Sequence, residues 1–357
     1  MTSPVRFAII GSGWRSEFHM RMAKAAPDRL EVVAVVAETD AEVQRIAARW
    51  GVTAVRTIGE ALARKPEFVV SAVSWPAMPG IVRELVAAGA KVMAETPPAP
   101  DLDGLRSLWH DVGATGRVQI GEQYTLMPGH ASRLAVTRAG TIGTVTSVEI
   151  ASTHLYHAVA LVRAMLGVDM EAVAVNARAF SAPLVDPLSF HGWVKDPMPE
   201  PKNTTIATLD FGGGRMGLYD FVDNQWWNPL RARRIVIRGS LGEIVDDTVI
   251  RLTQEGPVTS PIVYRRTGVD MNLEGNEVVH TSFDGRVIYR NPWVGTNLSE
   301  DDIAVASHLA AVGLWARDEG PAPYSLAQGC QDHAIGLAIE QSVRTEADVR
   351  VESEVWA

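Results

Sequence analysis

The stretch FAIIGSGWRSEFHM, residues 7–20, decides the fold of the amino-terminal half of the chain. A short apolar run ends at residue 10, and Gly-Ser-Gly follows before a helical pattern begins. In such a strand–turn–helix unit the first glycine permits the tight turn and the second lets the backbone approach a pyrophosphate. The amides that open the helix would meet the phosphates with the positive end of its dipole. The cofactor contacts predicted for this turn are Gly11, Ser12, Gly13, Trp14 and Arg15.

Short β-rich runs alternate with helical patterns over the first 122 residues. The runs that predict strands are Val5–Ile10, Glu31–Ala37, Thr53–Val55, Glu67–Val73, Ala90–Ala94 and Arg117–Gly121. The segments with helical apolar spacing are Ser16–Ala26, Asp40–Trp50, Ile58–Arg64, Pro79–Ala88 and Leu102–Val112. Alternation of this kind produces right-handed crossovers and a parallel sheet covered on both faces. Residues 1–122 are therefore predicted to form a doubly wound α/β domain.

Period-two alternation replaces this pattern after Gly121. The stretches that read as strands are VTSVEIAST, MEAVAVNARAF, TTIATLDF, RMGLYDF and RRIVIRGS. Helical patterns are sparser here and cover Tyr156–Leu166, Asp301–Arg317 and Ser325–Val343. Residues 123–357 are therefore predicted to form an α+β domain with a large, mainly antiparallel open sheet. A chain of 357 residues exceeds the size of one hydrophobic core, which agrees with two domains.

Composition excludes several classes of protein. The formal net charge of −9, with no cluster of Lys and Arg, argues against a nucleic-acid surface. No apolar run approaches the length of a membrane span, and the chain enters its first predicted strand too early for a secretory leader. The single cysteine, Cys330, fits a reducing compartment. We therefore expect a cytoplasmic protein that binds neither nucleic acid nor a membrane.

An acidic residue supports the dinucleotide interpretation. Glu38 ends the second predicted strand, about twenty residues beyond the glycine-rich turn, where a carboxylate would accept both ribose hydroxyls. Glu38 would repel a 2′-phosphate, so NAD is favoured as the cofactor. Arg15 beside the turn leaves NADP open, because an arginine there could receive that phosphate.

The stretch VMAETPPAP, residues 92–100, holds polar groups at the end of another predicted strand. Its two adjacent prolines cannot donate backbone hydrogen bonds, so the chain must leave the sheet at Glu95. The strand end therefore presents a carboxylate and the hydroxyl of Thr96, which raises the question of their chemistry.

The ordered series of motifs resembles the glucose-fructose oxidoreductase, inositol dehydrogenase and rhizopine catabolism (Gfo/Idh/MocA) family over about residues 5 to 350. The matching pieces are the glycine turn followed by His19, then AAGAKVMAETPPA, GEQYTLMP, AGTIGTVTSVEI, YHAVALVRAMLG, RGSLGEI and AIGLAIEQSVRTEADVRV. The resemblance implies a Rossmann domain and a sheet domain that binds substrate and mediates oligomers. It also implies NAD(P)-linked oxidation or reduction of a sugar, cyclitol or related polyol. Because an open sheet face needs covering, we expect a homodimer or homotetramer.

The chain departs from the family at positions that the resemblance makes catalytic. Where the family has Glu-Lys-Pro at the strand end, this sequence keeps Glu95 but has Thr96 in place of the lysine. The family's Asp-x-x-x-His pair maps onto Thr153 and His157, so the histidine is kept and the aspartate is lost. His157 is the predicted base, since an imidazole titrates near neutral pH. Loss of one preorganised donor such as the lysine typically costs about 10²–10³ in rate, so other groups must compensate or the reaction differs.

The remaining candidates surround these positions. We predict catalytic roles for His157, Thr96 and Tyr156. Further cofactor contacts are predicted at Glu38, Ser74, Trp75, Glu95 and Gln123, and substrate contacts at His154, Thr153, Tyr124, Trp226 and Trp227. The last two lie in DNQWWNP, where indoles suit the C–H faces of sugars, but they could equally bury in a subunit interface. Although His154 and His157 are three apart, no third ligand stands at helical spacing, and no metal is expected.

Three functions fit these features. The first is an NAD(P)-dependent oxidoreductase acting on a secondary alcohol or ketone. The second is a lyase, glycosidase or epimerase-like enzyme that oxidises its substrate only transiently with bound NAD, which the loss of the lysine at Thr96 suggests. The third is a non-catalytic nucleotide-binding paralogue, because two expected catalytic positions are altered. The fold alone does not decide among them.

Overall fold

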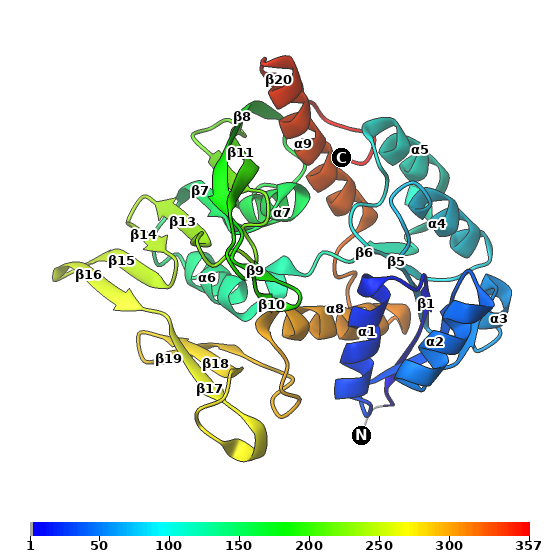
Figure 1. The fold of residues 1–357 in the computed structure, drawn as a ribbon. Coiled ribbons are helices and arrows are strands. Elements are labelled where there is room, and N and C mark those ends of the chain that lie inside the picture. Colours follow the sequence, from blue (N-terminus) through cyan, green and yellow to red (C-terminus); the bar gives the residue numbers. More distant parts are fainter. Residues whose placement is uncertain (1–2) are drawn as a thin grey trace.

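The computed structural model describes residues 3–357, which form two units of secondary structure (Figure 1). The first is a six-stranded parallel sheet with the order β3-β2-β1-β4-β5-β6. Its strands are β1 (Val5–Ile10), β2 (Leu30–Val36), β3 (Ala54–Val55), β4 (Phe68–Ser71), β5 (Val92–Ala94) and β6 (Val118–Ile120). This is the order of a Rossmann fold, and it reverses between β1 and β4. Doubly wound sheets bind their ligands beyond the carboxyl ends of the strands at such a reversal.

Local signals set the helices that cover this sheet. These helices are α1 (Trp14–Ala25), α2 (Asp40–Trp50), α3 (Ile58–Leu62), α4 (Met78–Ala87) and α5 (Leu102–Val112), followed by the turn η1 (Gly113–Thr115). Thr39 and Thr57 cap α2 and α3 by accepting the backbone N–H of the residue three positions on. The glutamates at those positions, Glu42 and Glu60, accept the N–H of the capping residues in return.

A helix from the far end of the chain, α8 (Glu300–Ala316), completes the first unit. Figure 1 shows it in orange beside α1, in blue. Gly313 permits the close approach, because a Cβ there would lie 2.4 Å from Cγ1 of Val5. Ile303 of α8 belongs to the same buried apolar cluster as Phe7 of β1.

The second unit is built on a nine-stranded sheet with the order β16-β15-β14-β13-β7-β12-β11-β8-β20. Its strands are β7 (Val145–Ala151), β8 (Val173–Val185), β11 (Pro199–Asp210), β12 (Met216–Val222), β13 (Arg234–Gly239), β14 (Gly242–Val245), β15 (Thr248–Thr253), β16 (Gly256–Pro261) and β20 (Val349–Val351). Neighbouring strands are antiparallel except β7 and β12, which are parallel.

Two helices, α7 (Leu155–Leu166) and α9 (Leu326–Thr345), pack on this sheet and on each other. Helix α9 also reaches the first sheet, since Gly329 lies where a Cβ would be 2.6 Å from Cγ1 of Ile120. The smaller elements are η2 (Tyr124–Leu126), α6 (Pro128–Arg138), β9 (Leu188–Ser189), β10 (Gly192–Trp193), β17 (Val263–Thr267), η3 (Val269–Met271), β18 (Glu277–Phe283) and β19 (Arg286–Arg290). Of the helices within residues 3–357, none has both the length and the apolar character that crossing a membrane requires.

The predicted fold class is confirmed, and the predicted bounds of β1, α2 and α5 coincide with the observed ones. The expectation that helices are sparse after Gly121 missed α6. This helix buries polar side chains such as His130 and Arg133, which break the apolar pattern that marks a helix in sequence. The short hairpin strands from β14 to β19 were also missed.

Replacing Gly11 by alanine is expected to destabilise the fold. Gly11 has a φ of +116°, and a Cβ there would lie 2.4 Å from the carbonyl oxygen of Ala72. The clash and the strained backbone together should lower the free energy of unfolding by about 2–5 kcal/mol, measured by urea denaturation. Gly13→Ala is the control, because its φ is −76° and nothing lies within 4 Å of the added Cβ. Equal losses in the two variants would contradict the prediction.

Candidate functional site

The carboxyl ends of β1, β4, β5 and β6 bring the predicted site residues to one edge of the first sheet. Gly11 follows β1, Ser74 follows β4, Glu95 follows β5 and Gln123 follows β6. The predicted base, His157, lies in the first turn of α7. Its bond to Glu122, in the loop after β6, brings the start of α7 to this edge of the sheet. The site therefore lies where the two units meet.

The turn between β1 and α1 fits a dinucleotide phosphate. Gly13 is the N-cap of α1, and no side chain caps this helix. A Cβ on Gly13 would have no neighbour within 4 Å, and Trp14 beside it is 74% exposed. A helix start with no protein cap and open space before it can accept an anion at its amides. The Ser12 hydroxyl is already used, donating to Oε1 of Glu42 at 2.7 Å.

Glu38 fits the ribose end of such a cofactor. Its side chain is exposed, and within residues 3–357 only its carbonyl oxygen is bonded, by the guanidinium of Arg56. The carboxylate is therefore open to ribose hydroxyls. Arg15, the residue that left NADP open, directs its guanidinium to Glu95 instead.

Glu95 is the centre of a buried charged cluster. Nε of Arg15 lies 2.9 Å from Oε2 of Glu95, and Nε2 of His19 lies 2.6 Å from Oε1. Burial alone would raise the pKa of Glu95, but Arg15 and the hydrogen bond from His19 outweigh burial and lower the pKa to about 2. The carboxylate packs against Gly121, where a Cβ would lie 3.3 Å from Cδ of Glu95. Both oxygens of Glu95 thus have protein partners, and the cluster ties α1 to the end of β5.

Gln123 extends this cluster to α8. Its Oε1 accepts from Nη2 of Arg15 at 3.3 Å, and its Nε2 donates to Oδ1 of Asp301 at 3.2 Å. Asp301 lies in the first turn of α8. The loop after β6 is therefore held between the first helix of the chain and α8.

His157 has a carboxylate partner that sequence reasoning missed. Nδ1 of His157 lies 2.5 Å from Oε2 of Glu122, and both side chains are buried. The other oxygen of Glu122 accepts the backbone N–H of Tyr124 at 3.0 Å. A carboxylate that accepts from Nδ1–H leaves a lone pair on Nε2, the form that a general base needs. Glu122 thus supplies the carboxylate that the resemblance leads one to expect at Thr153.

Thr96 and Tyr156 meet across the boundary of the two units. Their side chains lie close to each other, and the peptide bond from Thr96 to Pro97 is cis. Burial raises the pKa of Tyr156, so its phenol remains protonated near neutral pH and can donate. The Tyr156 ring lies 4.5 Å from the His157 ring between centroids. The structure therefore brings the predicted catalytic residues together.

The predicted substrate residues surround His157 from the second unit. Ring centroids of His154 lie 5.1 Å from His157 and 5.2 Å from Trp226, and the His157 ring lies 4.4 Å from Tyr124. Burial, with a smaller effect of His157, lowers the pKa of His154 to about 3, so this imidazole is neutral. The Thr153 hydroxyl is buried and has no hydrogen-bond partner within residues 3–357.

Two of the residues predicted to contact substrate or cofactor, Trp227 and Trp75, lie outside the group of rings around His157. The Trp227 ring is perpendicular to that of Trp226 and 6.4 Å from Phe190. Trp75 is exposed and stands edge-on to His333 of α9 at 6.5 Å. His333 in turn lies 5.6 Å from Tyr156, so His333 stands between Trp75 and the predicted catalytic residues.

Sequence reasoning missed Glu122 and His333 and gave His19 no role. Glu122 stands two residues after the buried strand β6, close to the signal that marked Glu95. His333 gave no signal, because it lies within an apolar helical pattern. Within residues 3–357 no group of His, Cys, Asp and Glu side chains is arranged to hold a metal.

Comparison with known proteins agrees with this geometry. Residues 5–122 match the model of the GFO_IDH_MocA family, an oxidoreductase family with an NAD-binding Rossmann fold. Among curated proteins, no sequence matches the chain. The first unit thus matches the NAD-binding Rossmann domain of this oxidoreductase family, in agreement with the resemblance noted from the sequence over these residues.

Solved structures extend the likeness to the whole chain. A myo-inositol dehydrogenase from Corynebacterium glutamicum is 19% identical with a TM-score of 0.67, and the match covers 98% of this chain and 100% of that one. An oxidoreductase from Agrobacterium radiobacter in complex with NAD⁺, L-tartaric acid and magnesium is 14% identical, with a TM-score of 0.69 and coverage of 97% and 98%. The WlbA dehydrogenase from Bordetella pertussis in complex with NADH and UDP-GlcNAcA is 16% identical, with a TM-score of 0.66 and coverage of 99% of both chains. At these identities the likeness shows the fold alone.

Removing the charge of Glu95 is expected to destabilise the protein. Glu95→Gln leaves the guanidinium of Arg15 largely buried without its counter-ion, which should lower the free energy of unfolding by about 3–5 kcal/mol in urea denaturation. Glu352→Gln is the control, because its pair with Arg350 is exposed and should contribute less than about 1 kcal/mol. Because the folded pKa of Glu95 is lowered, its contribution is present above its unfolded value of about 4.3 and is lost as the pH falls towards about 2. If the difference in the free energy of unfolding between Glu95→Gln and the wild type does not shrink over this pH range, the assigned ion pair of Glu95 is contradicted.

Proposed function

We propose that the protein is an NAD-dependent oxidoreductase that acts on a secondary alcohol or ketone of a sugar, cyclitol or related polyol. The observation that carries this proposal is the hydrogen bond of 2.5 Å between His157 and Glu122, next to the edge of an NAD-binding sheet. Oxidising an alcohol requires a proton acceptor beside the reacting carbon, and a carboxylate-held imidazole is such a group.

The cofactor residues follow from the geometry of the first unit. The amides at the start of α1, with Gly11 and Gly13, would hold the pyrophosphate, and Glu38 would accept the hydroxyls of the adenosine ribose. A ribose with free hydroxyls suits Glu38 better than one with a 2′-phosphate, so we propose NAD rather than NADP. Bound at these residues, NAD would supply hydride transfer to or from the substrate. We also propose that Ser74, Trp75 and Gln123 contact the cofactor.

His157 would take the proton of the substrate hydroxyl at Nε2 during oxidation. Glu122 at Nδ1 fixes the tautomer and the orientation of the ring, and stabilises the imidazolium that forms. The Tyr156 phenol, protonated because its pKa is raised by burial, would donate a hydrogen bond to the substrate oxygen. Thr96 lies close to Tyr156 and would help to orient its hydroxyl. Tyr156 and Thr96 together thus take over the donor role that the resemblance gives to a lysine.

The absence of that lysine favours a second candidate function. A hydroxyl at Thr96 stabilises developing negative charge less than an ammonium does, so a reaction with only transient oxidation of the substrate also fits. Net formation of NADH in a screen of polyols would support the dehydrogenase. A product formed without change in nicotinamide absorbance would support the transient reaction. Tight NAD binding with no product from any polyol would favour a non-catalytic paralogue. That the protein forms a homodimer or homotetramer, and that it is cytoplasmic, remain predictions from the sequence.

His157→Asn is expected to lower kcat by about 10²–10⁴-fold, the usual contribution of a general base. The affinity for NAD, measured by isothermal titration calorimetry, should stay within about twofold, because His157 acts on the substrate. His110→Asn on the exposed face of α5 is the matched control and should retain activity. Full activity of the His157 variant would refute its role.

Glu122→Gln is expected to lower kcat by about 10²-fold or more, because an amide can donate to Nδ1 and favour the wrong tautomer of His157. The KM for the substrate and the affinity for NAD should change much less, since Glu122 acts through the histidine and serves as a positioning residue. Glu122→Asp keeps the carboxylate and should recover part of the lost kcat. If the aspartate variant is as slow as the glutamine variant while both fold, the positioning role is wrong.

A further inference from the structure

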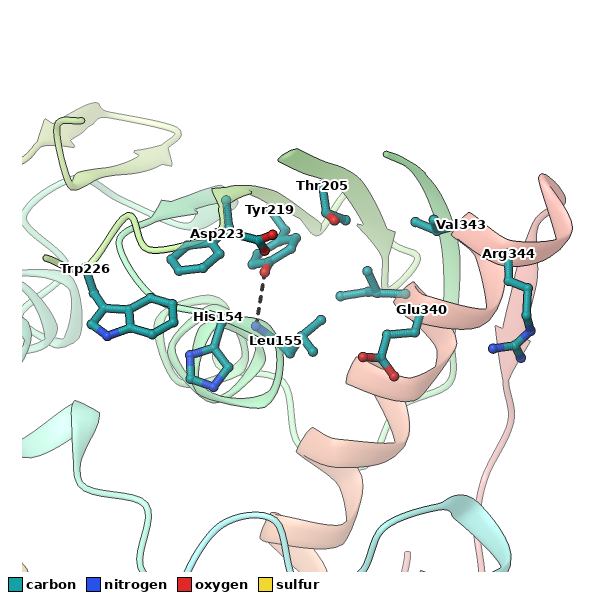
Figure 2. A pocket seen from close by; sticks show the side chains of 11 residues that line it. His154, Leu155, Thr205, Tyr219, Asp223, Trp226, Glu340, Val343 and Arg344 are labelled. Atoms are coloured by element: carbon teal, nitrogen blue, oxygen red, sulfur yellow. Dashed lines mark hydrogen bonds between the residues drawn. The ribbon is translucent and has the colours of Figure 1, made fainter. Parts of the chain in front are cut away.

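A pocket beside the proposed centre has the composition of a second sugar-binding subsite. It lies between β11 and β12 of the large sheet, the start of α7 and the last turns of α9, and its volume is about 430 Å³. Figure 2 shows side chains from all of these elements arranged around one space. Small-molecule sites usually measure about 300–1,000 Å³, so a ring-sized group fits this pocket.

One wall of the pocket is aromatic. The Trp226 ring stacks on that of Phe221, with centroids 5.2 Å apart and planes 14° from parallel. His154 lies beside Trp226, and Figure 2 shows both on the same side of the space. Phe221 is buried, whereas 41% of Trp226 is exposed. An indole that is held by its neighbours and remains accessible suits the C–H face of a sugar ring, because little side-chain freedom is lost on binding.

Charged groups that can bind hydroxyls line the rest of the pocket. Asp223 lies beside the aromatic wall, and Glu340 and Arg344 lie across the space from Trp226 (Figure 2). Asp223 lines the pocket, and its Oδ2 accepts the backbone N–H of Asn203 at 3.3 Å, which orients the carboxylate. Glu340 and Arg344 lie one helical turn apart on α9 and form no ion pair with each other or with any other residue from 3 to 357. Carboxylates accept and a guanidinium donates, so together they match the hydroxyl groups of a sugar. Two carboxylates against one guanidinium disfavour a phosphate group.

His154 joins this pocket to the proposed reaction centre. It lines the pocket, and its ring lies 5.1 Å from that of His157. The next residue, Leu155, has a φ of +35°, and its backbone N–H donates to the Tyr219 hydroxyl at 3.2 Å. Non-glycine residues adopt such a backbone only where the surrounding structure enforces it, often beside a binding site. The strained turn thus fixes His154 between the pocket and His157.

We propose that this pocket binds the second ring of a glycoside, so that the substrate is a disaccharide or a glycosylated polyol rather than a single ring. Its reacting ring lies at His157, and the neighbouring ring stacks on Trp226 and bonds to Asp223 and Glu340. The inference rests on the proposed function in placing the reacting carbon at His157. It goes beyond that function in the size and class of the substrate.

Saturation-transfer difference NMR on the full chain with NAD⁺ present tests the proposal. The probes are cellobiose, maltose, lactose and sucrose, compared with D-glucose and myo-inositol as single rings. At least one disaccharide should bind about tenfold or more tightly than either single ring, a difference well outside the error of a titration. None of the four binding more tightly than the single rings would overturn the proposal.

Three variants assign the effect to the pocket. Trp226→Ala should weaken binding of the preferred disaccharide about three- to tenfold, as expected for one stacking contact, and should weaken binding of the single rings much less. Glu340→Gln on the exposed side of α9 should also weaken binding of the disaccharide more than binding of the single rings. This second variant tests the pocket even if loss of the Trp226 indole disturbs folding. Trp193→Ala removes an exposed indole of β10 outside the pocket and is the control. Equal weakening by Trp226→Ala and Trp193→Ala would contradict the proposal.

Nicotinamide absorbance separates this inference from the proposed function. Formation of NADH from single-ring polyols with no preference for disaccharides would support the proposed function and refute the second subsite. Binding of a disaccharide through Trp226 and Glu340 without formation of NADH would support the subsite and refute the dehydrogenase.

Discussion

The buried ion pair between Arg15 and Glu95 is the interaction on which the arrangement of the site depends. Arg15 lies in the first turn of α1, immediately after the glycine-rich turn, and Glu95 directly precedes Thr96. His19 holds the second oxygen of the same carboxylate. The place where a pyrophosphate would lie is therefore fixed relative to the strand end that faces the substrate. Since withdrawing charges from water is costly, such a cluster is stable only with all of its partners present, and this makes the geometry well defined.

The groups proposed for chemistry are assembled from both units. Glu122 follows the last strand of the first sheet and bonds to His157 on α7 of the second unit. Thr96 and Tyr156 lie close together at the same boundary. A change in the relative placement of the units would thus separate the predicted base from its carboxylate. Chemistry of this kind requires the junction to be rigid, and the bonds of Gln123 to Arg15 and Asp301 contribute to that rigidity.

Much of the fold was predictable because its signals are local. The glycines at 11 and 13 stand between an apolar run and a helical pattern, and both the alternation of elements and the capping threonine of α2 are visible in the sequence. The site was predictable only in part. Motif comparison identified His157 and the replacement at Thr96, but the bond between Glu122 and His157 joins residues 35 apart through a tertiary contact. No periodicity encodes such a contact, and the carboxylate was expected at a different position.

The return of α8 to the first sheet makes the nucleotide-binding unit discontinuous in the sequence. A fragment ending at residue 122 would contain every strand of the parallel sheet but would lack the helix that buries Phe7 and Val5. Its apolar surface would face water along β1, the strand that leads into the glycine-rich turn, and aggregation would follow. A soluble cofactor-binding module cut from this protein therefore has to include residues 300–316, rejoined by a linker or by circular permutation.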